Sequence, residues 1–337
     1  MLAKGFEQLS IGGTSESSDS GQENESIISS QSTSSSEEPL DFGRNGYFPV
    51  TNGLCLRNQY KFLNLLGSGS FATVHKVEDI EAKSTVVLKI GRSGEVACKK
   101  EIAILELVSG CHENVVQFMG HFSVFGPYGK HSVMVFELLG SDLSTILKCA
   151  KKPLNFSTVR KYSKDILTGL EHIHAKCGVV HRDIKPENLM ISETGALKIG
   201  DFGLAVLNAE GCTRFVGTCE YMAPEVFSGS AISFPVDIWS FGCTLFEMVN
   251  RLKLFGRGAP KNLHIDEKLD VVFDEHSIFE SNPEPWLSSE LLKVWRPDME
   301  KEEAKVISAF LEKLLKSDPK KRLTAREAVE DPFFVDC

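Results

Sequence analysis

Residues 179–190 read Val-Val-His-Arg-Asp-Ile-Lys-Pro-Glu-Asn-Leu-Met, and Asp201-Phe202-Gly203 begins thirteen positions after the asparagine. The stretch places an aspartate, a lysine and an asparagine within six positions, between two apolar runs. Asp183 can orient an attacking hydroxyl and accept its proton, while Lys185 can neutralise negative charge on the oxygens of a phosphoryl group during its transfer. Asn188 and Asp201 offer oxygen ligands for a divalent metal. The combination predicts the movement of a phosphoryl group.

Each residue of this stretch, taken alone, also has an ordinary structural explanation. His181 could be a core histidine, Arg182 and Asp183 a surface pair, and Asn188 a turn residue. Three polar functions at fixed offsets, with a second motif following, argue against coincidence. Their order and spacing resemble the catalytic and metal-binding motifs of the eukaryotic protein kinases. The resemblance covers roughly residues 60–334.

The resemblance implies an α+β fold with two lobes. A small antiparallel sheet with one regulatory helix would span about residues 60–138, and a larger, mainly helical lobe about 142–334. The implied reaction transfers the γ-phosphoryl group of ATP to serine or threonine hydroxyls of protein substrates. Mg²⁺, with Mn²⁺ as an alternative, would be held by Asn188 and Asp201. Lys185, two residues after Asp183, resembles the serine/threonine branch of the family.

The alternative from another class is a pseudokinase, a scaffold that binds partners without catalysis. Such proteins usually lack the phosphate-binding lysine, the catalytic aspartate or the metal-binding aspartate. Lys89, Asp183 and Asp201 are all present here. The sequence therefore favours an active enzyme, although it leaves the kinase subfamily open.

A glycine-rich segment lies between two predicted strands, one over residues 63–66 and one running through Val77. Glycines let backbone amides approach phosphate oxygens, although such a hairpin alone is more often a plain turn. By resemblance it covers the nucleotide, with Ala72 in place of the third glycine. The implied nucleotide-binding residues are Leu66, Gly67, Ser68, Gly69, Ser70, Phe71, Ala72, Thr73 and Val74.

Lys89 lies within a β-branched run, residues 85–90, where a buried lysine needs an anionic partner. By resemblance it binds the ATP phosphates, with Val87 beneath the adenine. The next helix, expected over residues 96–108, carries Glu101 on its apolar face and Glu106 as a competitor. The pattern favours an ion pair between Glu101 and Lys89.

Residues 132–140 are predicted to form a strand that runs into a hinge. By resemblance, Phe136 borders the back of the nucleotide site, and the backbone of Glu137 and Leu139 hydrogen-bonds adenine. Asp142 could reach the ribose or cap the helix that follows. Met190 completes the implied nucleotide-binding set.

The segment between Phe202 and Glu225 resembles a kinase activation segment. Arg182 precedes the catalytic aspartate, as in kinases switched on by phosphate, and Thr213 is the expected acceptor unless it merely faces solvent. Thr218 is expected to hydrogen-bond Asp183 and Lys185. Two structural roles also follow from the resemblance: Glu225 pairs with Arg322, and Asp237 anchors the backbone of the catalytic loop. Glu187 suggests a preference for basic residues before the acceptor.

The bulk composition is that of an ordinary soluble protein of 337 residues, with 25% charged residues and a formal net charge of −9. The negative charge argues against nucleic acid or an anionic membrane as a partner. Nine cysteines show no C-x-x-C spacing, and no apolar run approaches the roughly 20 residues of a membrane span. We expect protein substrates, an upstream activating kinase and a cytoplasmic or nuclear location, and the oligomeric state stays open.

Residues 1–45 form a separate, serine- and glutamate-rich tail. The segment around residues 15–38 has too few large apolar residues to offset its chain entropy, so it is predicted to be disordered. Serines beside acidic residues suggest a phosphorylatable regulatory tail, with an inert tail as the alternative. Residues 251–300 match the family least and receive no assignment.

Overall fold

The structure is a computed structural model that divides the chain into Met1–Pro39 and Leu40–Cys337. It describes residues 46–51, 53–94, 97–108, 110, 112–127, 129–208, 216–255, 289, 292–293 and 296–335. The predicted tail, Thr213 and most of residues 251–300 therefore lie outside the described residues. Within the described ranges, no helix is both long and apolar enough to cross a bilayer.

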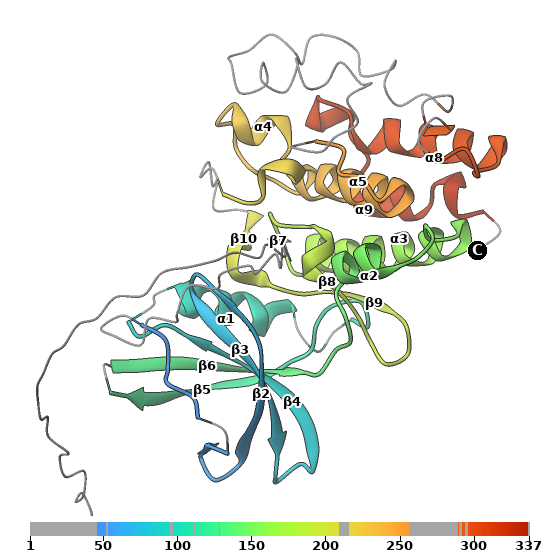
Figure 1. The fold of residues 1–337 in the computed structure, drawn as a ribbon. Helices are drawn as coiled ribbons and strands as arrows, with labels where there is room; N and C mark the ends of the chain where they lie inside the picture. The colour runs from blue at the N-terminus through green and yellow to red at the C-terminus, as the bar shows by residue number, and fades with distance from the viewer. Residues whose placement is uncertain are drawn as a thin grey trace, which may run out of the picture. The chain divides into compact units, whose positions relative to one another are not determined.

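A six-stranded antiparallel sheet forms the first lobe, with strand order β1-β2-β3-β4-β6-β5. Its strands are β1 (Cys55–Leu56), β2 (Tyr60–Gly69), β3 (Ala72–Asp79), β4 (Ser84–Gly91), β5 (Phe118–Gly126) and β6 (Gly129–Glu137). Helix α1 (Ala97–Val108) is the helix of this lobe among the described residues. β2 extends through Gly69, so the glycine-rich segment is the tip of the β2–β3 hairpin (Figure 1).

The two faces of the sheet belong to different cores. One face packs Phe62, Val77, Leu88 and Val133 into a separate apolar cluster. Helix α1 and Met134 of β6 join the core that continues into the helical lobe. This division follows from the alternation of side chains along each strand. α1 is therefore placed where its residues can meet both lobes.

The helical lobe is built around α3 (Phe156–Glu171) and α5 (Pro235–Asn250) (Figure 1). Val159, Ile166 and Leu170 lie at helical spacing on α3 and are buried, as a core-facing stripe requires. α5 is buried almost throughout, because its sequence is apolar on every side. The other α-helices described here are α2 (Leu143–Cys149), α4 (Pro224–Phe227), α8 (Lys301–Leu314) and α9 (Ala325–Val329).

Short elements between α3 and α4 carry the polar motifs. Strand β7 (Val179–Val180) pairs with β10 (Val206–Leu207), and β8 (Leu189–Ile191) pairs with β9 (Leu197–Ile199). The 181–188 stretch joins β7 to β8, and the Asp201 motif follows β9. Two small sheets thus bring motifs thirteen residues apart to one place.

Candidate active site

Lys89 of β4 meets two carboxylates from distant parts of the chain. Its Nζ lies 2.6 Å from Oε1 of Glu101 on α1 and 2.9 Å from Oδ1 of Asp201. Burial would lower the pKa of Lys89, but the charges and hydrogen bonds of Asp201 and Glu101 raise it above its ordinary value. The competing Glu106 is exposed and lies 3.4 Å from His121 instead. The structure therefore joins Lys89 to Glu101.

Asp201 is held in an uncommon backbone conformation. Its φ of 54° lies in the left-handed region, which few non-glycine residues adopt. The next residue, Phe202, is fully buried and packs edge-on against the His181 ring, with the ring centroids 4.9 Å apart. The Lys89 charge lowers the pKa of Asp201, although desolvation by the surrounding protein atoms opposes this. An apolar anchor thus fixes a carboxylate that stays charged.

Asp183 is the centre of a hydrogen-bond network in the catalytic loop. Its Oδ1 accepts from Thr218 Oγ1 at 2.8 Å, and its Oδ2 lies 2.8 Å from Lys185 Nζ. Lys185 Nζ also donates to Thr218 Oγ1 at 2.7 Å. Asn188 Nδ2 donates to both the backbone oxygen and Oδ2 of Asp183, at 2.8 and 2.9 Å. The expected contacts of Thr218 with Asp183 and Lys185 are present.

A buried carboxylate on α5 fixes the backbone of this loop. Asp237 accepts from the N–H of His181 at 2.8 Å and of Arg182 at 2.7 Å, as the sequence analysis expected. His174 Nε2 lies 2.8 Å from the same carboxylate. Burial would raise the pKa of Asp237, but the His174 hydrogen bond and charge and the His181 contacts bring it below its usual value.

Sequence reasoning missed His174. The sequence offers one signal: His174 directly follows the apolar Ile173, four positions after Leu170, so it falls beside an apolar face of a helix. In the structure it is buried and stacks on the Phe234 ring, 4.7 Å between centroids. His174 therefore supplies a third donor to Asp237.

Arg182 adopts a φ of 70° and donates from Nε to the backbone oxygen of Leu204 at 2.6 Å. It thus reaches from the catalytic loop to the start of the activation segment. Thr213, the expected phosphate acceptor, lies outside the described residues.

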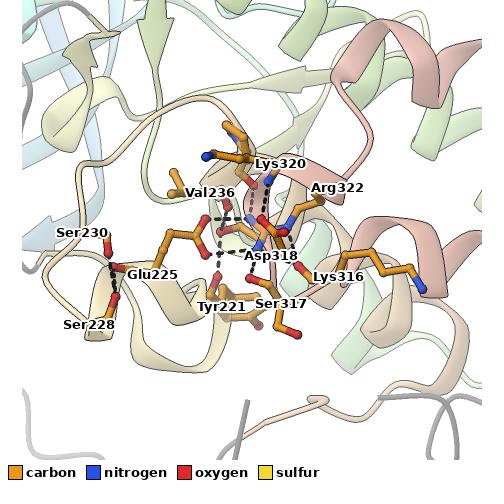
Figure 2. Close-up of polar contacts among 12 residues, drawn as sticks. Tyr221, Glu225, Ser228, Ser230, Val236, Lys316, Ser317, Asp318, Lys320 and Arg322 are labelled. Atoms are coloured by element: carbon orange, nitrogen blue, oxygen red, sulfur yellow. Dashed lines mark hydrogen bonds and ion pairs between the residues drawn. The ribbon is translucent and has the colours of Figure 1, made fainter. Parts of the chain in front are cut away.

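The expected pair at the far end of the activation segment is present and buried (Figure 2). Arg322 Nη1 and Nη2 lie 2.7 and 3.1 Å from the two carboxylate oxygens of Glu225, a bidentate arrangement. The guanidinium also donates to the backbone oxygens of Pro235 and Lys316, at 2.7 and 2.8 Å. Because the arginine is fully buried, this network ties the end of the segment to α5 and the loop after α8.

The tip of the β2–β3 hairpin is exposed, with Leu66 and Phe71 at 50% and 62% of full exposure. On β3, Val74 pairs with Lys89 of β4 and lies on the face opposite Thr73. The Thr73 side chain is buried, and its Oγ1 lies 3.0 Å from His75 Nε2. Strand alternation therefore turns the Thr73 side chain away from the face that carries Lys89, and its backbone is the part that could contact nucleotide.

Around the hinge, the backbone N–H of Glu137 donates to Gln117 O at 3.1 Å. No hydrogen bond of the described residues uses the Leu139 backbone. Asp142 makes the contacts of a helix cap, which is one of the two roles expected for it. Its two oxygens accept from Thr145 N at 2.8 Å and Thr145 Oγ1 at 2.7 Å at the start of α2.

The remaining predicted nucleotide-binding residues lie on these same elements. Phe136 is half-buried at the end of β6, where its ring lies 5.6 Å from that of Phe118. Val87 on β4 and Met190 on β8 are half-buried as well. The Met190 side chain packs so closely on Gly200, before Asp201, that a Cβ there would lie 2.4 Å from it.

The donor set at Asn188 and Asp201 fits a hard divalent cation such as Mg²⁺. Asn188 uses its amide nitrogen to bind Asp183, so its Oδ1 is the atom that could serve as a ligand. Asp201 is ionised, and half of its side-chain surface is exposed. Mg²⁺ is commonly bound by one or two protein oxygens, with water and substrate phosphates completing the shell. Within the described ranges, no cluster of three acidic, histidine or cysteine residues forms an all-protein metal site.

Comparison with known proteins gives a consistent result. A family model described as "Protein kinase domain" matches residues 60–334. The serine/threonine-protein kinase SRPK of Physarum polycephalum is 28% identical, over 90% of this chain and 92% of that protein. Cyclin-dependent kinase 4 of Xenopus laevis is 31% identical, over 83% and 92%. The crystal structure of the PF14_0431 kinase domain is 22% identical with a TM-score of 0.67, covering 86% of this chain and 98% of that one, and supports the fold alone.

Proposed function

The chain belongs to the protein kinase family as an ATP-dependent protein serine/threonine kinase, and we propose that the residues around Asp183 and Lys89 carry out its phosphoryl transfer. The observation that carries this proposal is the 2.9 Å contact between Lys89 and Asp201, residues 112 positions apart. It brings the phosphate-binding lysine of the sheet lobe to the motif that follows the catalytic loop. Groups from both lobes are thereby placed around one substrate position.

We assign ATP binding to the β2–β3 hairpin, Lys89 and the hinge. Backbone N–H groups of the hairpin can meet phosphate oxygens, and Lys89 can donate to them while Glu101 holds its position. The Leu139 N–H and Glu137 carbonyl are the groups proposed to meet adenine. Asn188 and Asp201 would hold Mg²⁺, which offsets negative charge on the phosphate oxygens when bound.

Asp183 is proposed as the residue that orients the acceptor hydroxyl and takes its proton. Lys185, Thr218 and Asn188 fix its carboxylate from three directions. Lys185 also places a positive charge beside the position where charge develops on the transferring group. Because such transfers depend on positioning and electrostatics, the rigid loop contributes directly to the rate.

Asp183→Asn tests the assignment. The variant is expected to lower kcat by about 10²–10⁴-fold, because it removes the proton acceptor while keeping the shape of the side chain. The measurement is incorporation of labelled phosphate from Mg-ATP into a mixed protein substrate, followed by phosphoamino-acid analysis. ATP affinity, measured by calorimetry, should stay near that of the wild type. Near wild-type turnover in the variant would refute the assigned role.

We also propose that an acidic pair favours basic residues before the acceptor. Glu187 is exposed. Burial raises the pKa of Glu247 most, and the negative charge of Glu187 raises it further. Glu247 also accepts a hydrogen bond from Tyr221, which lies at the end of the activation segment. Two neighbouring carboxylates beside the substrate-facing segment would attract a cationic side chain.

A positional-scanning peptide library tests this preference. Wild type should favour arginine upstream of the acceptor, and Glu187→Gln should reduce that preference by about tenfold in kcat/KM. Glu193→Gln, the same change at another exposed glutamate of the lobe, serves as the matched control. A wild-type profile that gains nothing from upstream arginine would remove the proposal.

Phosphorylation of Thr213 is proposed as the activating event. Its support is Arg182, which connects the catalytic loop to Leu204 at the beginning of the segment. A phosphate would add charge for this guanidinium to pair with. Phosphorylation by an upstream kinase should raise wild-type kcat and leave Thr213→Ala unchanged. Equal activation of both proteins would exclude Thr213 as the acceptor.

A further inference from the structure

Residues 46–51 and 53–56 precede the region that matches the family, yet they are built into the first lobe. Phe48 is buried and packs edge-on against His131, with ring centroids 5.2 Å apart. Val50 and Leu54 pack on the same apolar cluster beside the sheet. The Gly46 carbonyl accepts from Ser93 N at 3.0 Å. This strap is therefore anchored on both sides of Tyr47.

Tyr47 reaches from the strap to the tip of the β2–β3 hairpin. Its hydroxyl donates to the backbone oxygen of Gly69 at 2.7 Å. The guanidinium of Arg92, just past β4, lies over the Tyr47 ring at 4.9 Å. Arg92 Nη1 makes a longer contact of 3.4 Å with the Ser70 carbonyl, and its backbone N–H donates to Phe71 O at 2.9 Å. Three consecutive carbonyls of the tip are thus bonded to groups outside the hairpin.

These bonds have a defined effect on the peptide groups that follow each carbonyl. In a planar trans peptide, the carbonyl of one residue and the N–H of the next point in opposite directions. Holding the Gly69 and Ser70 carbonyls therefore directs the N–H groups of Ser70 and Phe71 away from the strap. Those N–H groups are the donors that a phosphate would need.

Packing does little to hold the tip in place. Ser68, Gly69, Ser70 and Phe71 are all exposed. The conformation of a loop with few buried contacts is held mainly by its hydrogen bonds, so each bond contributes a large share of that stabilisation. The contacts from Tyr47 and Arg92 are consequently suited to set the loop conformation before nucleotide binds.

We propose that Tyr47 and Arg92 form a clamp that orients the peptide groups of the glycine-rich tip toward the phosphates of ATP. Tyr47 acts as a positioning residue contributed by the strap, through Gly69 and not through contact with nucleotide. The proposal rests on ATP binding by this hairpin, as assigned above. It makes residues outside the family-matched region part of the nucleotide-binding machinery.

Tyr47→Phe isolates the clamp, because it removes the hydroxyl and keeps the ring beneath Arg92. The affinities of the full chain for ATP and for adenosine are measured by calorimetry, together with KM for ATP and for a protein substrate. We expect a loss of about three- to fivefold in ATP affinity, with a parallel rise in KM for ATP, from one lost hydrogen bond. Adenosine affinity and KM for protein should not change, since neither depends on the phosphate-binding peptides.

Tyr60→Phe is the matched control. Tyr60 lies on β2 of the same sheet and stacks on Phe122, away from the hairpin tip. This variant should bind ATP as the wild type does. Unchanged ATP affinity in Tyr47→Phe, an equal loss for adenosine, or the same loss in Tyr60→Phe would each overturn the clamp. Failure of the wild type itself to bind ATP would instead overturn the assignment of the nucleotide site.

Discussion

The catalytic loop and the glycine-rich hairpin are both held by hydrogen bonds, but by bonds of different kinds. The catalytic loop is fixed by Asp237, which is fully buried and accepts from two backbone N–H groups and His174. The hairpin tip is exposed and is held by Tyr47 and Arg92 at the surface. One loop depends on buried charge, and the other on solvent-accessible contacts.

This difference matters energetically. A typical hydrogen bond contributes a net stability of about 1 kcal/mol, whereas leaving a buried charge without its partner costs about 3–5 kcal/mol. The loop that carries Asp183 is therefore rigid, and the glycine-rich hairpin can adjust at small cost. The contrast predicts large effects from changes in the helical lobe and small ones at the hairpin.

The largest effect should come from Arg322→Met, which tests whether buried charge supports the helical lobe in general. It leaves the Glu225 carboxylate buried without its bidentate partner, so the free energy of unfolding should fall by about 3–5 kcal/mol. Chemical denaturation measures the change. Arg326→Met is the matched control, because Arg326 pairs with Glu330 at the surface and its loss should have little effect. Similar losses in the two variants would contradict the contrast.

Asp237→Asn should lower kcat by about 10²-fold and leave KM for ATP nearly unchanged. The carboxylate of Asp237 accepts from the N–H groups of His181 and Arg182 and from His174. The NH₂ group of asparagine would face one of these donors without accepting from it, so the backbone at His181 and Arg182 should shift. Steady-state kinetics measure both constants. Asp165→Asn is the control, because Asp165 also accepts a backbone N–H, from Leu197 at 2.9 Å, but away from the catalytic loop. A rise in KM without a fall in kcat would refute the positioning role.

A pH effect sharpens the comparison between the lobes. Burial lowers the pKa of His75 in the sheet lobe from 6.5 to about 4. The unfolded chain thus binds more protons between these values, so the stability that neutral His75 provides is complete above pH 6.5 and lost as pH falls toward 4. Between pH 7.5 and pH 5 the loss should be about 2 kcal/mol, and it should be absent in His75→Gln. Denaturation at these two pH values measures it.

In the helical lobe, the pH-dependent loss of stability that arises from Asp237 is expected at lower pH. The pKa of Asp237 lies below its ordinary 3.8, so the stability from its ionised form is present above 3.8 and lost as pH falls below that value. Below pH 4 the stabilities of wild type and His75→Gln should therefore change in parallel with pH, because both proteins keep Asp237. Identical pH profiles for the two proteins between pH 5 and 7.5 would show that His75 is not the group responsible.

Ala72→Gly should give the smallest effect. Ala72 is buried in β3 at the site where related kinases carry a third glycine. Glycine adds backbone freedom at a cost of roughly 0.5–1 kcal/mol, so the melting temperature should fall slightly and KM for ATP should rise by about twofold or less. Thermal denaturation and steady-state kinetics measure the two changes. An effect on kcat as large as that of Asp237→Asn would remove the distinction between the loops.

Much of the candidate site could be predicted because its residues form short motifs with fixed spacing. Asp183, Lys185, Asn188 and Asp201 follow from one stretch and its neighbour. The pairing of Lys89 with Glu101 followed from helical periodicity and the cost of an unpaired buried charge. Local rules sufficed where both partners were marked by sequence patterns.

The sequence left a role open where a side chain had two compatible ones. Asp142 could cap a helix or bind ribose, and the structure shows its bonds to Thr145 at the helix start. Thr73 lay in the glycine-rich segment, and strand alternation placed its side chain beside His75. His174 carried no motif, and its function became visible only through its contact with Asp237.

The sequence by itself determined the reaction class and marked the candidate residues for it, because the chemistry requires particular functional groups at fixed offsets. The tertiary structure alone decided what holds them. Tyr47 and Gly69 are 22 positions apart, and His174 and Asp237 are 63 apart. No local periodicity links such partners. They meet because the packing of sheet and helices fixes distances that the chain leaves free.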